Sequence, residues 1–306
     1  MRKQIRRILA ATDFSEVSGN VVPLGVKIAR ELDATLYVCH VIDLPTISLY
    51  GETVFEPIMQ QQRYIDFARR EIETLMEKSG GEGIDWEPVI SVGQPVDEIT
   101  SVVAEKNIDL VITATHGRSG LRRLFLGSVT ERLMRALACP LLLFKVDAPE
   151  SSRHVIQRFP FRRILVGCDF SDDSNRAVEF GISMSQEFES ELHLVHVVEP
   201  TAYNEYFRLP SGPEEPLQQD LYDSIREKLG TLIPGEALDW CTAKSTVLVG
   251  KPYAEIVRYA GINDIDLICL GVRGHGMVEE ILIGSTTDRV VRRAPCPVLS
   301  MSPAVK

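Results

Sequence analysis

The sequence predicts an α/β protein made of two tandem doubly wound domains, each a parallel sheet with helices on both faces. The chain has 306 residues, about twice a common domain length of roughly 150. Short β-branched runs alternate with amphipathic stretches in both halves, which is typical of βαβ units and a parallel sheet. Motifs of the first half also return, in the same order, in the second half. Each half is therefore predicted to be a complete domain.

The repeat is visible in pairs of motifs that keep a nearly constant offset. Ala11-Thr-Asp-Phe-Ser15 returns 156 positions later as Gly167-Cys-Asp-Phe-Ser171, and His40-Val41 returns as His196-Val197. Four further pairs lie 157 positions apart: Gly93-Gln-Pro95 and Gly250-Lys-Pro252, Asp109-Leu110 and Asp266-Leu267, Gly127-Ser128 and Gly284-Ser285, and Cys139-Pro140 and Cys296-Pro297. Six pairs with a single one-residue insertion or deletion indicate a duplication.

The segment between the halves has the composition of a linker. It contains Pro149, Ser151, Ser152 and Pro160, which interrupt regular structure. We expect a first domain over residues 1–147, a linker over 148–160 and a second domain over 161–306.

Strands and helices are expected to alternate along the first half. The strands should lie near residues 5–11, 35–41, 86–92, 110–114 and 141–146. Helices are predicted over 21–32, 57–78 and 96–104, where apolar residues recur at helical spacing and prolines stand at the helix starts. Residues 43–56 and their proline-rich counterpart 199–216 fit neither element and are predicted to be long loops.

The charge balance argues against nucleic-acid and membrane partners. The chain carries 33 basic and 43 acidic residues, a net charge of -10, which gives no general attraction to phosphate backbones or anionic lipid. No stretch approaches the roughly 18 apolar residues of a membrane span. The basic first residues resemble the start of a secretory signal, but the apolar run after them ends at Asp13. A cytoplasmic location is expected.

The six cysteines also favour a cytoplasmic location. None forms a C-x-x-C pair, and several lie in apolar runs where a free thiol behaves as a small buried hydrophobe. They are Cys39, Cys139, Cys168, Cys241, Cys269 and Cys296. A reducing compartment is consistent with this use of cysteine.

In each half the fourth strand runs into a glycine-rich loop and then a helix. The second half reads G-x2-G-x9-G-S and contains Gly271, Gly274, Gly276, Gly284 and Ser285. The first half has the same spacing with Ala114, Gly117, Gly120, Gly127 and Ser128. Glycines let backbone N–H groups approach a phosphate, and the helix expected over 286–293, with Ser285 as its N-cap, would offer its N-terminus to an anion. Two such loops predict phosphate binding.

The charges around the two loops differ. Arg118, Arg122 and Arg123 surround the first loop, whereas the second has Arg273 and His275 together with Glu279 and Glu280. These charges either act on a bound anion or form a solvated face. If they act on the anion, the first half is expected to bind it more tightly, because like charges oppose the ligand in the second.

With these motifs the sequence resembles the universal stress protein family over nearly the whole chain. The matching features are the aspartates after strand one, the valines at the end of strand two, the G-x-P turns, the glycine loops and the Cys-Pro before the last strand. The resemblance implies a five-stranded parallel sheet in the order 3-2-1-4-5, with ATP at the switch point between strands one and four. Open α/β sheets generally bind ligands there.

Position by position, the resemblance implies an ATP site in each half. Asp13 and Asp169 would lie beside the ribose and phosphates and would hold the Mg²⁺ that accompanies ATP, while Val41 and Val197 would offer backbone groups to adenine. The other residues implied to contact the nucleotide are Ala114, Gly117, Arg118, Gly120, Gly127, Ser128 and Val129 in the first half, and Gly271, Gly274, Gly276, Gly284, Ser285 and Thr286 in the second. Ala114 departs from the family pattern by one methyl group.

Three functions from different classes remain open on the sequence. The first is a regulatory module switched by ATP. The second is a slow ATPase or phosphotransferase, although no Walker lysine follows the glycines and no base is evident. The third is an interaction scaffold with vestigial pockets. Product formation from ATP separates the second function from the first, and absence of bound nucleotide favours the third.

The histidines raise a zinc hypothesis that the spacing does not support. His116 and His275 lie in the glycine loops, and His40 and His196 lie at the second strand of each half. The repeat sets His116 against Arg273, so the two loop histidines are out of register. No ligand cluster with a tetrahedral geometry follows from this spacing.

The last strand of each half is expected to join the two domains. Residues 141–144 would form an exposed apolar edge that needs covering. In the resembled family this edge is the usual dimer contact. The resemblance therefore implies that residues 141–146 and 298–302 pack the halves as a pseudo-dimer, and the same edge allows a homodimer.

Overall fold

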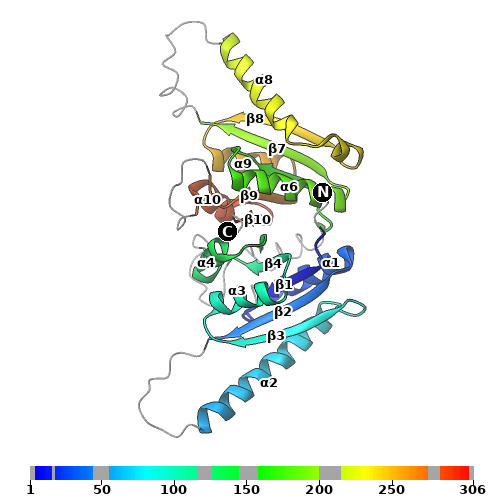
Figure 1. The fold of residues 1–306 in the computed structure, drawn as a ribbon, viewed down its shortest axis with the longest axis vertical. Helices are drawn as coiled ribbons and strands as arrows, with labels where there is room; N and C mark the ends of the chain where they lie inside the picture. Colours follow the sequence, from blue (N-terminus) through cyan, green and yellow to red (C-terminus); the bar gives the residue numbers. More distant parts are fainter. Residues whose placement is uncertain are drawn as a thin grey trace. The chain divides into compact units, whose positions relative to one another are not determined.

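The computed structural model describes residues 4–15, 18–43, 55–115, 126–144, 158–199, 215–274 and 283–302 (Figure 1). Contacts within the chain define two compact units, one containing residues 5–156 and the other residues 157–306. The domain limits at residues 147 and 160 stay predictions. Among the described residues, no helix combines the length and apolar character that crossing a membrane requires.

Five parallel strands form the sheet of the first unit in the order β3-β2-β1-β4-β5. The strands are β1 (Arg7–Ala11), β2 (Thr35–Ile42), β3 (Trp86–Val92), β4 (Leu110–Ala114) and β5 (Leu141–Phe144). In register, Ile8 of β1 lies between Leu36 of β2 and Leu110 of β4. The predicted strand order is confirmed, and it places the reversal of the strand order between the parallel strands β1 and β4.

The helices of the first unit form two layers, as expected for a doubly wound fold. They are α1 (Val21–Leu32), α2 (Phe55–Lys78), α3 (Pro95–Glu105) and α4 (Ser128–Ala136), and a 3-10 turn, η1 (Ser18–Asn20), precedes α1. The helix α1 contacts α2, and α3 contacts α4. Crossovers that run in opposite directions along a parallel sheet place their helices on opposite faces.

The second unit repeats this arrangement in the order β8-β7-β6-β9-β10. Its strands are β6 (Arg163–Gly167), β7 (Glu191–Val198), β8 (Ala243–Val249), β9 (Leu267–Gly271) and β10 (Val298–Met301). Its helices are α6 (Asp172–Glu187), α8 (Glu215–Thr231), α9 (Pro252–Ile262) and α10 (Ser285–Arg293), with a 3-10 turn, η2 (Gly235–Asp239), after α8.

An aspartate holds the start of the central strand in each unit. Asp109 Oδ2 accepts hydrogen bonds from the backbone N atoms of Arg6 and Arg7, each at 2.9 Å. Asp266 Oδ2 accepts from the backbone N atoms of Arg162 and Arg163, at 2.9 and 3.0 Å. Each carboxylate ties the segment before the fourth strand to the start of the first. This contact aligns the two strands whose carboxyl ends form the switch point.

The central strands are continuous apolar runs because they are buried in the cores of the two units. The strands β4 and β9 are buried along their whole length, because helices cover both faces of the sheet. Five cysteines are buried and Cys139 is half-buried, and all six are free thiols. Burial raises the pKa of the Cys39 thiol to about 12. The interpretation of these cysteines as small core residues is confirmed for the five buried ones.

Several predicted boundaries were wrong by a few residues. The helix α2 begins at Phe55 and α8 at Glu215, so the ends of the predicted loops 43–56 and 199–216 are helical. The strand β1 begins at Arg7 rather than at residue 5, and β2 continues to Ile42. Residues 44–54 and 200–214, the greater part of both loops, lie outside the described residues.

Candidate functional site

In each unit, described residues at the carboxyl ends of the central strands line a cavity. The cavity of the first unit measures about 420 Å³ and that of the second about 340 Å³. Both volumes fall in the usual range for small-molecule sites. Each cavity lies where the strand order reverses, between β1 and β4 or between β6 and β9. Open α/β sheets bind ligands at such switch points.

The first cavity gathers the described residues that the sequence singled out in the first half. They are Asp13, Val41, Ala114, Gly127, Ser128 and Val129. Asp13 follows β1, Val41 and Ala114 lie at the carboxyl ends of β2 and β4, and the other three residues lie at the start of α4, so the fold brings together four separate parts of the sequence. Gly117, Arg118 and Gly120 lie outside the described residues.

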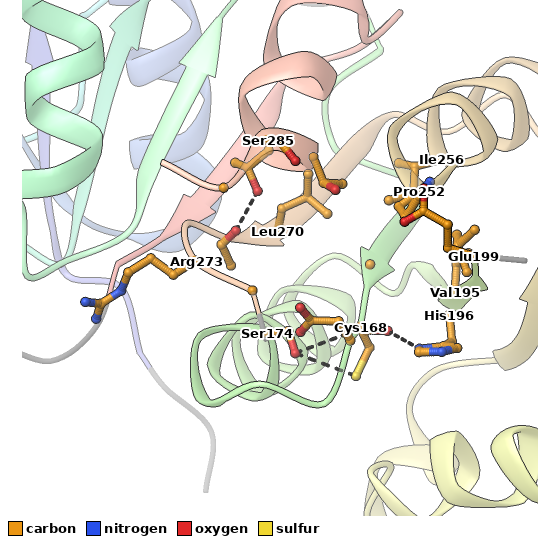
Figure 2. A pocket seen from close by; sticks show the side chains of 18 residues that line it. Cys168, Ser174, Val195, His196, Glu199, Pro252, Ile256, Leu270, Arg273 and Ser285 are labelled. Carbon is orange, nitrogen blue, oxygen red and sulfur yellow. Dashed lines mark hydrogen bonds between the residues drawn. The ribbon is translucent and has the colours of Figure 1, made fainter. Parts of the chain in front are cut away.

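The second cavity has the same composition (Figure 2). It is lined by Asp169, Val197, Gly271, Gly274, Gly284, Ser285 and Thr286. Gly276 lies outside the described residues. In Figure 2 the Arg273 side chain is directed away from Val195, His196 and Glu199 at the other end of the cavity.

The two aspartates are held in the same local turn. Asp13 Oδ1 accepts hydrogen bonds from Ser15 N at 3.0 Å and Ser18 Oγ at 2.5 Å. Asp169 Oδ1 accepts from Ser171 N at 3.0 Å and from the hydroxyl of the same serine at 2.5 Å. Aspartate commonly bonds the backbone two residues on in such turns. Each carboxylate is therefore fixed at the mouth of its cavity.

In the second unit this carboxylate lies directly against the glycine loop. A Cβ added at Gly274 would stand 2.6 Å from Asp169 Oδ2. A side chain at this position would push the carboxylate away. The glycine therefore allows the close approach of Asp169 to the loop, which the sequence pattern alone did not reveal.

A helix N-terminus forms one wall of each cavity. Gly127 and Gly284 are the N-caps of α4 and α10, and their backbone N atoms donate to Thr115 O at 2.9 Å and Val272 O at 2.8 Å. The prediction that Ser285 caps the last helix was wrong. Ser285 is the first residue of α10, and the N-cap is Gly284, which has no side chain that could cap the helix. The N–H groups of the first turn have no partner within the helix and lie at the helix end that borders the cavity, where they could bind an anion.

The acids in these first turns are paired within their own helices. Glu131 accepts from Arg135 at 3.1 Å, and Asp288 accepts from Arg292 at 2.7 Å. Each pair spans one helical turn. The pairing reduces the repulsion that a free carboxylate would exert on an anion at the N-terminus.

Other lining residues were missed by the sequence analysis. They form matched pairs across the two cavities: Thr12 and Cys168, Ser18 and Ser174, Asp43 and Glu199, Pro95 and Pro252, Ile99 and Ile256, and Thr130 and Thr287. Thr130 Oγ1 donates to Ala114 O at 3.0 Å, and Thr287 Oγ1 donates to Gly271 O at 2.7 Å. Every pair lies 156 or 157 positions apart. The repeat offset was therefore the signal that could have found them.

The fold and the paired cavities define a tandem α/β protein of the doubly wound class, with one ligand-sized site at each switch point. A model of the universal stress protein family matches residues 4–145 and, a second time, residues 160–300. The chain belongs to the universal stress protein family, as a tandem two-domain member.

Individual relatives agree with this assignment. A universal stress protein of Methanocaldococcus jannaschii is 30% identical over 146 residues, which cover 47% of this chain and 85% of the relative. One from Synechocystis is 21% identical over 318 residues, which cover 97% of this chain and 99% of the relative. A crystal structure of a universal stress protein from Archaeoglobus fulgidus has a TM-score of 0.70 and 25% sequence identity, covering 98% of this chain and 99% of that chain. The last two relatives share the two-domain length.

Proposed function

We propose that the protein binds ATP in both cavities and acts as a regulatory module that responds to the bound nucleotide. The observation that carries the proposal is the duplicated set of groups. Each cavity combines an oriented aspartate, a glycine N-cap and a helix N-terminus within one site of small-ligand size. Such a set suits a ligand with a phosphate chain and a sugar.

Roles within the site follow from the chemistry of each part. The triphosphate would lie at the N-termini of α4 and α10, where Ser128 and Ser285 stand in the first turn. Adenine would lie at the ends of β2 and β7, against backbone groups of Val41 and Val197. The ribose would lie between these two regions. Gly117, Arg118, Gly120 and Gly276, which lie outside the described ranges, are also proposed to contact the nucleotide.

Mg²⁺ is proposed to arrive with the nucleotide. No group of three or more His, Cys, Asp or Glu side chains within the described residues could hold a metal ion unaided. One carboxylate in each cavity nevertheless suits Mg²⁺, which proteins commonly hold through one or two carboxylates together with substrate phosphates. Asp13 and Asp169 are the proposed ligands, directly or through water.

The decisive experiment counts nucleotides. Purified protein is denatured, and the released nucleotide is identified and quantified per chain. Calorimetric titration of the nucleotide-free protein with ATP, with and without Mg²⁺, then gives affinity and stoichiometry. We expect two ATP per chain. If the protein binds no adenine nucleotide, the proposal is wrong and an interaction scaffold is favoured. If it steadily releases ADP from ATP, an ATPase is favoured.

The last strands are proposed to pair the two domains as a pseudo-dimer. The strands β5 and β10 end the sheets of their own units, and an unpaired apolar edge strand favours association. An experimental structure in which either strand faces solvent would contradict this proposal. We also propose a cytoplasmic location, because the cysteines are free thiols.

A further inference from the structure

A histidine at the end of the second strand makes the same two contacts in each unit. His40 Nδ1 lies 2.8 Å from Thr12 O, and its ring stacks on Phe14 with 4.1 Å between centroids and 26° between planes. His196 Nδ1 lies 2.8 Å from Cys168 O, and its ring lies 5.0 Å from that of Phe170 at 34°. Figure 2 shows the bond from His196 to Cys168. The contacts occur twice, between matched positions of the repeat.

The two contacts fall on either side of the cavity aspartate. The bonded carbonyl belongs to the residue before the aspartate, and the stacked ring belongs to the residue after it. Because a carbonyl oxygen only accepts hydrogen bonds, Nδ1 carries a proton and donates. The histidine therefore holds the backbone on one side of Asp13 or Asp169 and a side chain on the other.

The stacked phenylalanines have a backbone that needs such support. Phe14 has φ 60° and Phe170 has φ 65°, in the left-handed region that bulky residues rarely adopt. Such a strained backbone conformation is kept only where contacts with the surrounding structure hold it, and it is found most often at functional sites. The left-handed residue turns the chain so that the serine two positions after the aspartate donates its backbone N–H to the carboxylate.

Simple core packing does not account for the pair of contacts. A ring that only filled space would not need a donor, yet Nδ1 reaches a carbonyl at the same distance in both units. Both histidines are only partly buried, at the ends of strands where the cavities open. The ring geometry differs between the units, since Phe14 stacks closer to its histidine than Phe170 does, and Lys228 Nζ lies 4.1 Å from the centre of the Phe170 ring.

We propose that His40 and His196 are positioning residues for the aspartates that face the nucleotide. Each histidine fixes the Asp-Phe-Ser turn so that the carboxylate is already oriented when Mg-ATP enters. The proposal deepens the proposed function and rests on it for its ligand, whereas the effect of each histidine on its turn does not depend on any ligand. Residues that orient the ligands of a metal ion typically change metal affinity by about 10–100-fold when they are replaced.

The test separates the two contacts by substitution in the full chain. His196→Asn keeps a donor near the position of Nδ1 but loses the ring, His196→Phe keeps the ring but loses the donor, and His196→Ala loses both. The same three substitutions are made at His40. The untouched cavity of each variant is the matched control. Calorimetry measures binding of ATP with and without Mg²⁺, and hydrogen exchange follows the amides of Ser15 and Ser171.

We expect His196→Ala to weaken Mg-ATP binding in the second cavity by about tenfold or more, with a smaller effect on ATP without Mg²⁺. The Asn and Phe variants should each restore part of the loss. The Ser171 amide should exchange faster in the Ala variant, while amides of β8 stay protected as evidence of intact folding. His40→Ala should act in the same way on the first cavity and on Ser15.

Two outcomes would overturn the inference, and both differ from failure of ATP binding. If wild-type protein binds Mg-ATP and the Ala variants bind it equally well, the positioning role is wrong although the proposed function stands. If the Ser15 and Ser171 amides exchange at wild-type rates in the Ala variants, the histidines do not hold the turns. A third outcome separates the two proposals. If no nucleotide binds to wild-type protein, but the Ser15 and Ser171 amides exchange faster in the Ala variants than in wild-type protein, the proposed function fails and the positioning of the aspartates stands.

Discussion

In the second unit, the backbone N and the guanidinium Nε of Arg273 both donate to Oδ2 of Asp173, at 3.1 and 3.3 Å. Asp173 is buried in the first turn of α6, and Arg273 belongs to the glycine loop after β9. The cation of this loop is therefore paired before any ligand arrives. The matching position of the first half is Val17, so the first half has no acid there. The pair thus distinguishes the two cavities.

We expect Asp173→Asn to tighten ATP binding in the second cavity. The substitution leaves the Arg273 charge uncompensated, and a unit charge at a partly screened distance from the phosphates contributes about 1 kcal/mol, or about fivefold in affinity. Calorimetry of the two variants Asp173→Asn and Asp172→Asn measures the effect. Asp172 is the matched control, because it is an exposed acid in the same turn. Equal affinities in the two variants would show that the pairing has no influence on the site.

The difference between Ala114 and Gly271 has a structural cause away from the ligand. A Cβ added at Gly271 would meet the backbone of α6, with Asp173 C and Ser174 N each at 2.7 Å. In the first unit Ser18, the position that matches Ser174, lies in the η1 turn, and α1 begins only at Val21. The methyl group of Ala114 is therefore accommodated where α6 would exclude it.

Gly271→Ala should consequently destabilise the second unit. Overpacking against fixed backbone costs about 1–3 kcal/mol. The reciprocal change, Ala114→Gly, removes a methyl group without a clash and should cost less, about 0.5–1 kcal/mol. Urea unfolding of the two variants gives both values. The explanation fails if Gly271→Ala unfolds at the same urea concentration as wild-type protein.

His193 gives the second unit a dependence on pH. The ring is buried on β7, with Nδ1 2.9 Å from Tyr259 Oη of α9 and Nε2 3.6 Å from Glu191 Oε1. Lys244 of β8 and Arg163 of β6 also pair with Glu191. Burial lowers the pKa of His193 below its usual value of 6.5, although Glu191 opposes the shift. The neutral ring is therefore the form that the fold prefers.

The sign of the effect follows from linkage. Since the pKa of His193 is lower in the folded state, the unfolded chain binds the proton more readily, and acid favours unfolding. Stability is complete above the unfolded pKa and declines as the pH falls from there towards the lower folded value. Urea unfolding at about pH 7.5 and about pH 5.5 should show less of this loss in His193→Gln than in wild-type protein. An identical loss in both proteins would assign the pH dependence to other groups.

The sequence predicted most of the architecture because the repeat and the strand pattern are local signals. The two domains, the alternation of strands and helices and the helix layers follow from them. The strand order and the gathering of Asp13 with Gly127, or of Asp169 with Gly284, were instead implied by the resemblance to the universal stress protein family. The contact between Arg273 and Asp173 could not be predicted, because it depends on where α6 begins, and an early helix start is not encoded by the glycine pattern. The bond from His40 of β2 reaches Thr12, the residue after β1, so predicting it needed the register between β1 and β2.

The two cavities are expected to bind ATP unequally, with the first unit binding more tightly. Backbone fit favours the second, in which the glycine pattern is complete. Charge favours the first, because Arg118, Arg122 and Arg123 accompany its loop in the sequence, while Glu279 and Glu280 accompany the second. These five residues lie outside the described ranges. The ion pair between Arg273 and Asp173 also favours the first unit, because Arg273 of the second loop is already paired with a carboxylate and attracts the ligand less.

Valine substitutions at the two N-cap glycines separate the sites. A Cβ at Gly284 would lie 3.1 Å from Val272 O and 3.7 Å from Gly274 N, so Gly284→Val should displace the glycine loop and abolish binding in the second cavity. Gly127→Val, at the matching N-cap of α4, should remove the tighter site. Gly261→Val is the control, because a Cβ at this position would meet no atom within 4 Å outside the backbone of its own helix. Calorimetric titration of the three variants decides the order of affinities, and survival of the tighter site in Gly127→Val would reverse it.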